Sequence, residues 1–167
     1  MTEEITNAEV EFPNGDTYKG EICNLKKNGK GIYNFKNGDK YEGGFSNGKF
    51  HGRGVLSLHT GEIYNGEWKD GIKSGQGELK LSNGDAFSGE FKEGKMNGKG
   101  KYIYATGNIY EGDFVENKFN GEGTYTYTNG EVYTGAWSDD RKNGTGKIIF
   151  NETSVLEGVW EKDLFKN

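Results

Sequence analysis

Residues 64–86 read YNGEWKDGIKSGQGELKLSNGDA, and this 23-residue pattern recurs along the chain without an insertion. It opens on an aromatic anchor, Tyr64, followed by glycine two positions later and by a large apolar residue, Trp68, four positions later. With the anchor counted as position zero, the copies begin at Tyr18, Tyr41, Tyr64, Phe87, Tyr110, Tyr133 and Leu156. A fixed period of this length predicts a repeat architecture of about seven units.

Glycine accounts for 29 of the 167 residues, against the roughly 7% that is usual. Such an excess suits either a flexible linker or a fold that needs glycine at set backbone positions. The glycines recur at positions two, seven, eleven, thirteen and twenty of the repeat, and only Gly44 lies outside these positions. This regular placement excludes the linker.

Each repeat is expected to form two short strands. Positions zero, two and four alternate with polar residues, as do positions thirteen, fifteen and seventeen, and alternation of this kind is typical of strands with one apolar face. Asn37-Gly38 and its copies predict turns between repeats, whereas six-residue polar loops such as 47–52 are expected within repeats. Thirteen strands follow, with open edges at residues 10–12 and 156–160.

The register of the strands follows from the turn between repeats. A three-residue loop, Lys36-Asn37-Gly38, with Gly38 in the left-handed conformation keeps the apolar faces matched and sets Tyr33 opposite Tyr41. It also sets Gly31 opposite Gly43. The equivalent pairs are Val10/Tyr18, Leu56/Tyr64, Leu79/Phe87, Tyr102/Tyr110, Tyr125/Tyr133 and Ile148/Leu156.

The motif Y-x-G-x-[W/F], followed by G-x-G-x-[Y/L]-x-[F/Y/L] and N-G at this period, resembles the MORN (membrane occupation and recognition nexus) repeat. The resemblance implies an all-β fold, an elongated single-layer twisted antiparallel sheet of tandem β-hairpins. We expect an N-terminal extension at 1–9, the repeat array at 10–160 and a C-terminal tail at 161–167. The resemblance also implies a scaffold or adaptor role, as in ciliary, flagellar or other cytoskeletal assemblies.

The aromatic face of the sheet is the first candidate site. A single layer has no second layer to cover it, so its rings are expected to form core in large part and also to receive a helix or extended segment of a partner protein. The residues of this expected trough are Tyr18, Tyr41, Phe45, Tyr64, Trp68, Phe87, Phe91, Tyr110, Phe114, Tyr133, Trp137 and Trp160.

A basic column at position eight is the second candidate. It would bind anionic phospholipid at a membrane face, or else form a solvated edge that blocks aggregation. Its members are Lys26, Lys49, Lys95, Lys118 and Arg141. Between them, Phe50, Met96 and Phe119 at position nine would insert into a membrane or pack against neighbouring loops. Acidic residues at position twenty-one are expected to make the other long edge negative: Asp16, Asp39, Glu62, Asp85 and Glu131.

Catalysis is not expected. His51 and His59 lie in different parts of one repeat without a third metal ligand, and Cys23 occupies a tolerant surface position, so we expect neither metal nor cofactor. A net charge of −5 gives no support for nucleic-acid binding. Without an apolar run of about 18 residues or a signal peptide, a cytoplasmic protein is expected. Its expected partners are another protein, and further copies of itself in a homodimer or an end-to-end assembly through the open edges.

Overall fold

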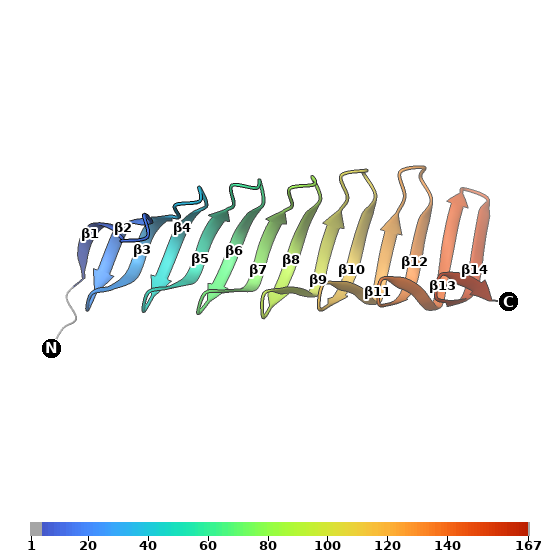
Figure 1. The fold of residues 1–167 in the computed structure, drawn as a ribbon. Coiled ribbons are helices and arrows are strands. Elements are labelled where there is room, and N and C mark those ends of the chain that lie inside the picture. Colours follow the sequence, from blue (N-terminus) through green and yellow to red (C-terminus); the bar gives the residue numbers. More distant parts are fainter. Residues whose placement is uncertain (1–4, 167) are drawn as a thin grey trace. The chain divides into compact units, whose positions relative to one another are not determined.

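The computed structural model describes residues 5–166, which contain fifteen β-strands in one antiparallel sheet and no helix. The strand order in the sheet is the order of the strands along the chain (Figure 1). Two compact units divide the chain, residues 1–82 and residues 83–167. The expected all-β sheet of tandem hairpins is confirmed.

The strands alternate in length with the two halves of the repeat. Unit 1 contains β1 (Thr6–Glu11), β2 (Thr17–Cys23), β3 (Lys26–Asn34), β4 (Lys40–Ser46), β5 (Lys49–Ser57), β6 (Ile63–Lys69) and β7 (Ile72–Lys80). Unit 2 contains β8 (Ala86–Lys92), β9 (Lys95–Ile103), β10 (Ile109–Val115), β11 (Lys118–Thr126), β12 (Val132–Ser138), β13 (Arg141–Asn151), β14 (Ser154–Glu161) and β15 (Leu164–Lys166). The expected count of thirteen strands is too low, because pairing begins at Thr6 and extends to Lys166.

The turns between repeats have the expected geometry. Phe35 donates its N–H to the carbonyl of Asp39 at 2.9 Å and Gly38 donates to the carbonyl of Phe35 at 3.0 Å, which closes a three-residue loop. Gly38 has a φ of 94°, in the left-handed region. The predicted pairs are confirmed at Val10/Tyr18, Tyr33/Tyr41, Gly31/Gly43, Leu56/Tyr64, Tyr102/Tyr110, Tyr125/Tyr133 and Ile148/Leu156.

The connections within repeats differ from the expectation. A two-residue turn joins β4 to β5, and both of its residues have positive φ, 50° at Asn47 and 84° at Gly48. Such turns match the twist of the strands they join. The expected six-residue loop at 47–52 is wrong, because Gly52 (φ 68°) forms a bulge inside β5 that lets the strand continue almost to the turn.

The anchor rings lie over pairs of glycines. Tyr41 is fully buried, and its hydroxyl donates to the carbonyl of Gly44 at 2.9 Å. Gly43 and Gly54 face each other across the strands beneath this ring, and a Cβ on Gly54 would lie 2.5 Å from the ring Cζ. Positions two and thirteen therefore hold glycine because any side chain there would displace the ring.

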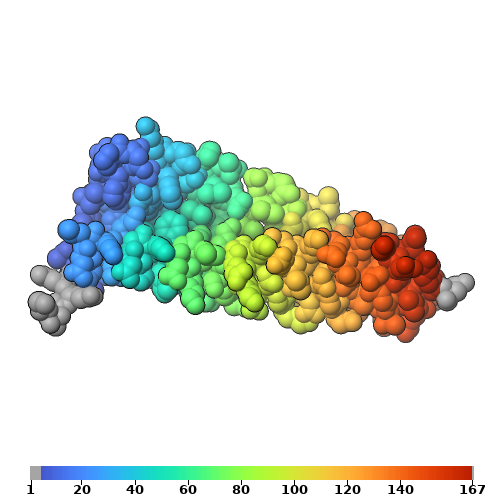
Figure 2. Space-filling model, turned by 60° about the horizontal axis from the view of Figure 1, so that its bottom comes forward, coloured from blue at the N-terminus to red at the C-terminus, as the bar shows by residue number. Residues whose placement is uncertain are grey.

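Contacts between rings join each repeat to the next. Tyr41 stacks on Phe50 with centroids 3.7 Å apart and meets Trp68 of the following repeat edge to face at 5.5 Å. In unit 2, Tyr110 meets Phe119 and Trp137 in the same way, at 3.7 and 5.3 Å. Within each unit, consecutive repeats form consecutive bands of the space-filling surface (Figure 2). Stability therefore rests on contacts between neighbouring repeats.

The aspartates at position twenty-one accept hydrogen bonds from the following turn. Asp16 is 8% exposed and accepts from the Tyr33 hydroxyl at 2.6 Å and from the N–H of Lys36 at 2.9 Å. Asp85 repeats this arrangement with the Tyr102 hydroxyl and the N–H of Ala105, both at 2.8 Å. At these two positions the expectation of a negative edge is wrong, because the carboxylates are buried and hydrogen-bonded.

These hydrogen bonds shift the pKa of the aspartate and of the tyrosine. The Tyr33 hydroxyl lowers the pKa of Asp16, and the N–H of Ala105 lowers the pKa of Asp85. Burial, followed by the bond to Asp16, raises the pKa of Tyr33 to about 12, so its hydroxyl stays a donor. A carboxylate with a lowered pKa stabilises the fold above its ordinary value of about 4, and that contribution disappears as the pH falls through the lowered pKa.

Gly54→Ala tests the fit between ring and glycine. The new methyl group would overlap the Tyr41 ring, so we expect the free energy of unfolding to fall by about 1–3 kcal/mol. Urea unfolding followed by tryptophan fluorescence measures the change. Gly48→Asn is the control, because Gly48 has no atom within 4 Å of a built Cβ and the equivalent position of another repeat holds Asn117 at a φ of 73°. Equal losses in the two variants would contradict the explanation.

The double variant Asp16→Asn, Asp85→Asn tests the contribution of these two hydrogen-bonded carboxylates. We expect it to be less stable than the wild type at pH 7, and the difference to be smaller at pH 2, because protonation of the wild-type carboxylates increases as the pH falls toward their lowered pKa values. Urea unfolding at both pH values measures this, with the exposed Glu157→Gln as control. A stability difference that does not change with pH would show that the charges of Asp16 and Asp85 contribute nothing to stability.

Candidate functional site

In each unit the residues of the expected trough lie on one face of the sheet, which we call the ring face, and all twelve are buried. Their exposed fractions range from 0% to 7%. The indole N–H groups of Trp68 and Trp137 donate to the carbonyls of Gly54 and Gly123 at 3.1 and 3.2 Å. These rings therefore form the core, and a partner would meet them chiefly through the side chains that cover them.

Position nine supplies much of that cover. Phe50 and Phe119 stack on the anchors Tyr41 and Tyr110. These two residues were expected either to insert into a membrane or to pack within the protein, and the structure shows packing. In other repeats, position nine is lysine. The ammonium groups of Lys27, Lys73 and Lys142 lie 5.9, 5.0 and 5.2 Å from the centroids of Tyr18, Tyr64 and Tyr133. Cation–π contact thus replaces stacking in these repeats.

A second aromatic row remains half-exposed beside the core. It comes from positions fifteen and seventeen and consists of Tyr33, Phe35, Tyr102, Tyr104, Tyr125 and Tyr127. The ring centroids of Tyr33 and Phe35 are 4.7 Å apart, and those of Tyr104 and Tyr125 are 6.0 Å apart. Sequence reasoning placed these residues on the apolar face but did not select them as a site, although their alternation was the signal that identifies them.

In unit 1 the second aromatic row borders a hollow of about 260 Å³. Tyr33, Phe35 and Phe50 supply its rings, Lys27 and Lys49 its cations, and the turn residues Gly48 and Gly71 its open side. The Lys27 ammonium lies 4.0 Å from the Tyr33 centroid, and burial lowers the pKa of Lys27. The hollow can hold an apolar or aromatic group close to positive charge.

The basic column at position eight is exposed as expected, at Lys26, Lys49, Lys95, Lys118 and Arg141. Two members are already paired with carboxylates at the next hairpin tip. Lys95 lies 3.1 Å from Glu116, and Lys118 lies 2.8 Å from Asp139. These ion pairs offset part of the positive charge that a membrane would meet.

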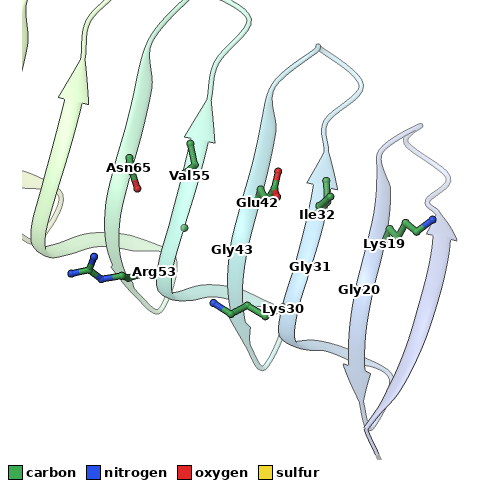
Figure 3. A pocket seen from close by; sticks show the side chains of 11 residues that line it. Lys19, Gly20, Lys30, Gly31, Ile32, Glu42, Gly43, Arg53, Val55 and Asn65 are labelled. Carbon is green, nitrogen blue, oxygen red and sulfur yellow. The ribbon is translucent and has the colours of Figure 1, made fainter.

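The opposite face of the sheet carries a groove in unit 1, which we call the glycine groove (Figure 3). Its volume is about 720 Å³ and its floor is the bare backbone of Gly20, Gly31, Gly43 and Gly54. One wall consists of Lys19, Ile32, Glu42, Val55 and Asn65. Lys30 and Arg53 lie together on the other wall (Figure 3).

Residues 5–166 contain no group of three or more His, Cys, Asp or Glu side chains placed to hold a metal ion. His59 pairs with Asp39, with 2.7 Å between Nδ1 and Oδ1.

Cys23 was expected at the surface, but its side chain is buried, so this expectation is wrong. No helix among the described residues has the length and apolar character needed to span a membrane.

Comparisons with known proteins define the fold and the family. No curated protein matches the sequence. Among solved structures, the Drosophila melanogaster SAS-4 (dCPAP) TCP domain in complex with a proline-rich motif of Ana2 (dSTIL) matches with a TM-score of 0.53 and 12% identity, over 92% of this chain and 90% of that chain. The Danio rerio CPAP TCP10 domain in complex with a STIL peptide matches with a TM-score of 0.54 and 10% identity, over 92% and 68%. At these identities the likeness concerns the fold alone.

The family model of the MORN repeat matches six consecutive segments, residues 26–40, 41–62, 64–86, 87–109, 110–132 and 133–152. Five of these segments begin at an anchor residue, and the six segments together span most of the chain. The chain therefore belongs to the MORN-repeat family.

Proposed function

We propose that this protein is a non-enzymatic scaffold whose ring face binds an extended, proline-rich segment of a partner protein. The second aromatic row carries this proposal, because it presents half-exposed rings on one repeat of unit 1 and on two consecutive repeats of unit 2. Aromatic-lined grooves are the usual receptors for polyproline II segments, which are already extended before they bind and lose little entropy. The buried trough rings support the row from beneath and hold it rigid.

The hollow in unit 1 supports the same proposal. Phe35 and Phe50 meet edge to face at 6.4 Å, and this leaves an apolar recess for a proline ring or another apolar side chain. The glycine turns at Gly48 and Gly71 keep the recess open. In unit 2 the equivalent turn positions hold Asn117 and Asp140, so we expect the partner to insert its main anchor in unit 1.

The structural neighbours lend further support. Two proteins of similar fold were solved with peptides of their partners, one of them a proline-rich motif. We infer for this chain a comparable peptide-binding role in a ciliary, flagellar, centriolar or other cytoskeletal assembly of the cytoplasm. The terminal strands β1 and β15 each pair on one side only among the described residues, so a homodimer or an end-to-end assembly belongs to the same proposal.

Binding of anionic phospholipid through the basic column is the alternative. The exposure of Lys26, Lys49 and Arg141 favours it. The ion pairs of Lys95 and Lys118 weaken it, since a membrane would have to displace Glu116 and Asp139. The partner-protein function therefore has the stronger support.

The double variant Phe35→Ala, Tyr104→Ala tests the proposed function. We expect it to bind a fluorescein-labelled decaproline peptide at least tenfold more weakly than the wild type, as measured by fluorescence anisotropy. Ile103→Ala is the matched control, because Ile103 is a 40% exposed residue at the end of β9, next to Tyr104 in the chain, and alternation along the chain directs its side chain away from the second aromatic row. Circular dichroism confirms that each variant is folded.

The lipid alternative is tested in parallel by co-sedimentation with vesicles of phosphatidylcholine containing phosphatidylserine. We expect no sedimentation that depends on phosphatidylserine. Sedimentation that the triple variant Lys49→Glu, Lys95→Glu, Lys118→Glu abolishes, together with unchanged decaproline binding in the aromatic double variant, would overturn the proposal in favour of lipid.

A further inference from the structure

One feature of the face that carries the glycine groove holds in four of the seven repeats and is missing from the second repeat, inside unit 1. At position three most repeats carry a carboxylate, and it accepts a hydrogen bond from the backbone N–H at position twelve of the same repeat. The distances are 3.2 Å from Lys30 N to Glu21 Oε1, 3.4 Å from Gln76 N to Glu67 Oε1, and 3.0 Å from Glu122 N to Asp113 Oδ2. The wall of the groove is thus usually closed by the protein's own acidic side chain.

The same carboxylate also meets a cation across the strands. Asp113 lies opposite Lys99 in the register, and Lys99 Nζ is 2.7 Å from Asp113 Oδ1. Glu67 lies opposite Arg53, with 3.9 Å between the guanidinium and Oε1. Position three therefore serves two donors, an N–H of its own repeat and a side-chain cation of the preceding one.

Gly44 replaces this carboxylate in the second repeat. It lies opposite Lys30 in the register, so Lys30 has no acidic neighbour there, and the N–H of Arg53 has no position-three side chain to accept its hydrogen. A Cβ built on Gly44 would run into the carbonyl oxygen of His51. The local backbone thus excludes the side chain that would close the wall.

The charges that line the groove are unevenly compensated. Glu42 is held by Lys40 at 2.8 Å, and Lys19 is held by Glu9 at 3.3 Å. Among the described residues no ion pair engages Lys30. The Arg53 side chain is 81% exposed, and its only carboxylate contact is the long one to Glu67. Lys30 thus lies beside the gap at Gly44 without a carboxylate to balance its charge, and the Arg53 side chain, which lies opposite Glu67, is only weakly paired.

We propose that this gap is a receptor for a carboxylate side chain, and that the glycine groove of unit 1 binds an acidic, extended segment of a partner protein. The incoming carboxylate takes the place of the missing position-three group, where it meets the ammonium group of Lys30 and the backbone N–H of Arg53. The floor of bare glycine lets the backbone of the segment approach closely, and Ile32 and Val55 contact its apolar atoms. Four strands at about 4.8 Å spacing offer room for about four extended residues.

Unit 2 provides an internal comparison. The corresponding groove is lined by Glu122, Glu157 and Lys147, with Thr134, Thr145 and Val159. Its carboxylates would repel an acidic segment. The inference therefore concerns unit 1 alone. It is independent of the proposed function, because the ring face and the glycine groove are opposite faces of the sheet.

The test is a titration of the ¹⁵N-labelled full chain with the peptide acetyl-(Thr-Glu)₄-amide, followed by amide chemical shifts. This peptide contains no proline, so it does not probe the ring face as decaproline does. We expect saturable shifts at Gly43, Gly44 and Arg53, and weaker binding when the salt concentration rises from 50 to 500 mM. The matched peptide acetyl-(Thr-Lys)₄-amide is expected to leave these amides unchanged.

Two variants separate the proposal from non-specific attraction. Lys30→Gln with Arg53→Gln is expected to weaken binding at least tenfold, whereas Lys99→Gln, which removes a cation already paired with Asp113, is expected to leave it unchanged. Both variants change exposed side chains, so folding is preserved. Absence of saturable shifts in unit 1, an equal response to the lysine peptide, or an equal loss in the two variants would overturn the proposal.

Discussion

The packing of one aromatic ring on two facing glycines is the contact on which the rest of this protein depends. The anchor ring needs the space that both glycines leave, and its hydroxyl reaches a backbone carbonyl three residues further along the chain. A single-layer sheet has no second layer to bury its apolar face. Here the face is covered by the anchor rings, which pack on bare backbone and are covered in turn by position four, position nine and the next repeat.

Because of this packing, the largest aromatic residues of the repeat do not form the accessible surface. The tryptophans and anchor tyrosines are the largest apolar groups in the sequence, and their burial removes them from direct contact with a partner. Half-exposed rings at positions fifteen and seventeen form the outer surface of that face instead. On the opposite face, the glycines that make room for the rings leave a groove whose chemistry is decided by the residues beside it. One structural requirement therefore shapes both candidate surfaces.

Residues that depart from the repeat pattern give single repeats a surface chemistry of their own. Gly44 removes a carboxylate that neighbouring repeats keep, and this opens a gap beside Lys30 and Arg53. Gly48 and Gly71 line the hollow of unit 1, whereas the bulkier Asn117 and Asp140 hold the equivalent turn positions in unit 2. A regular repeat can build a stable sheet, but identical repeats would present identical surfaces. Recognition of one particular partner segment therefore requires such local differences.

The sequence by itself determined the repeat, the strand pairs and the turn geometry at Gly38, because these follow from a 23-residue period, from parity and from backbone sterics. It did not determine the two-residue turns at the hairpin tips, since a bulge at Gly52 lets β5 continue almost to the turn, where a polar loop at 47–52 was expected. Nor did it determine that Asp16, Asp85 and Cys23 are buried. Only the tertiary structure decided these points, because burial depends on which repeat folds over which neighbour, and that contact joins residues about twenty positions apart.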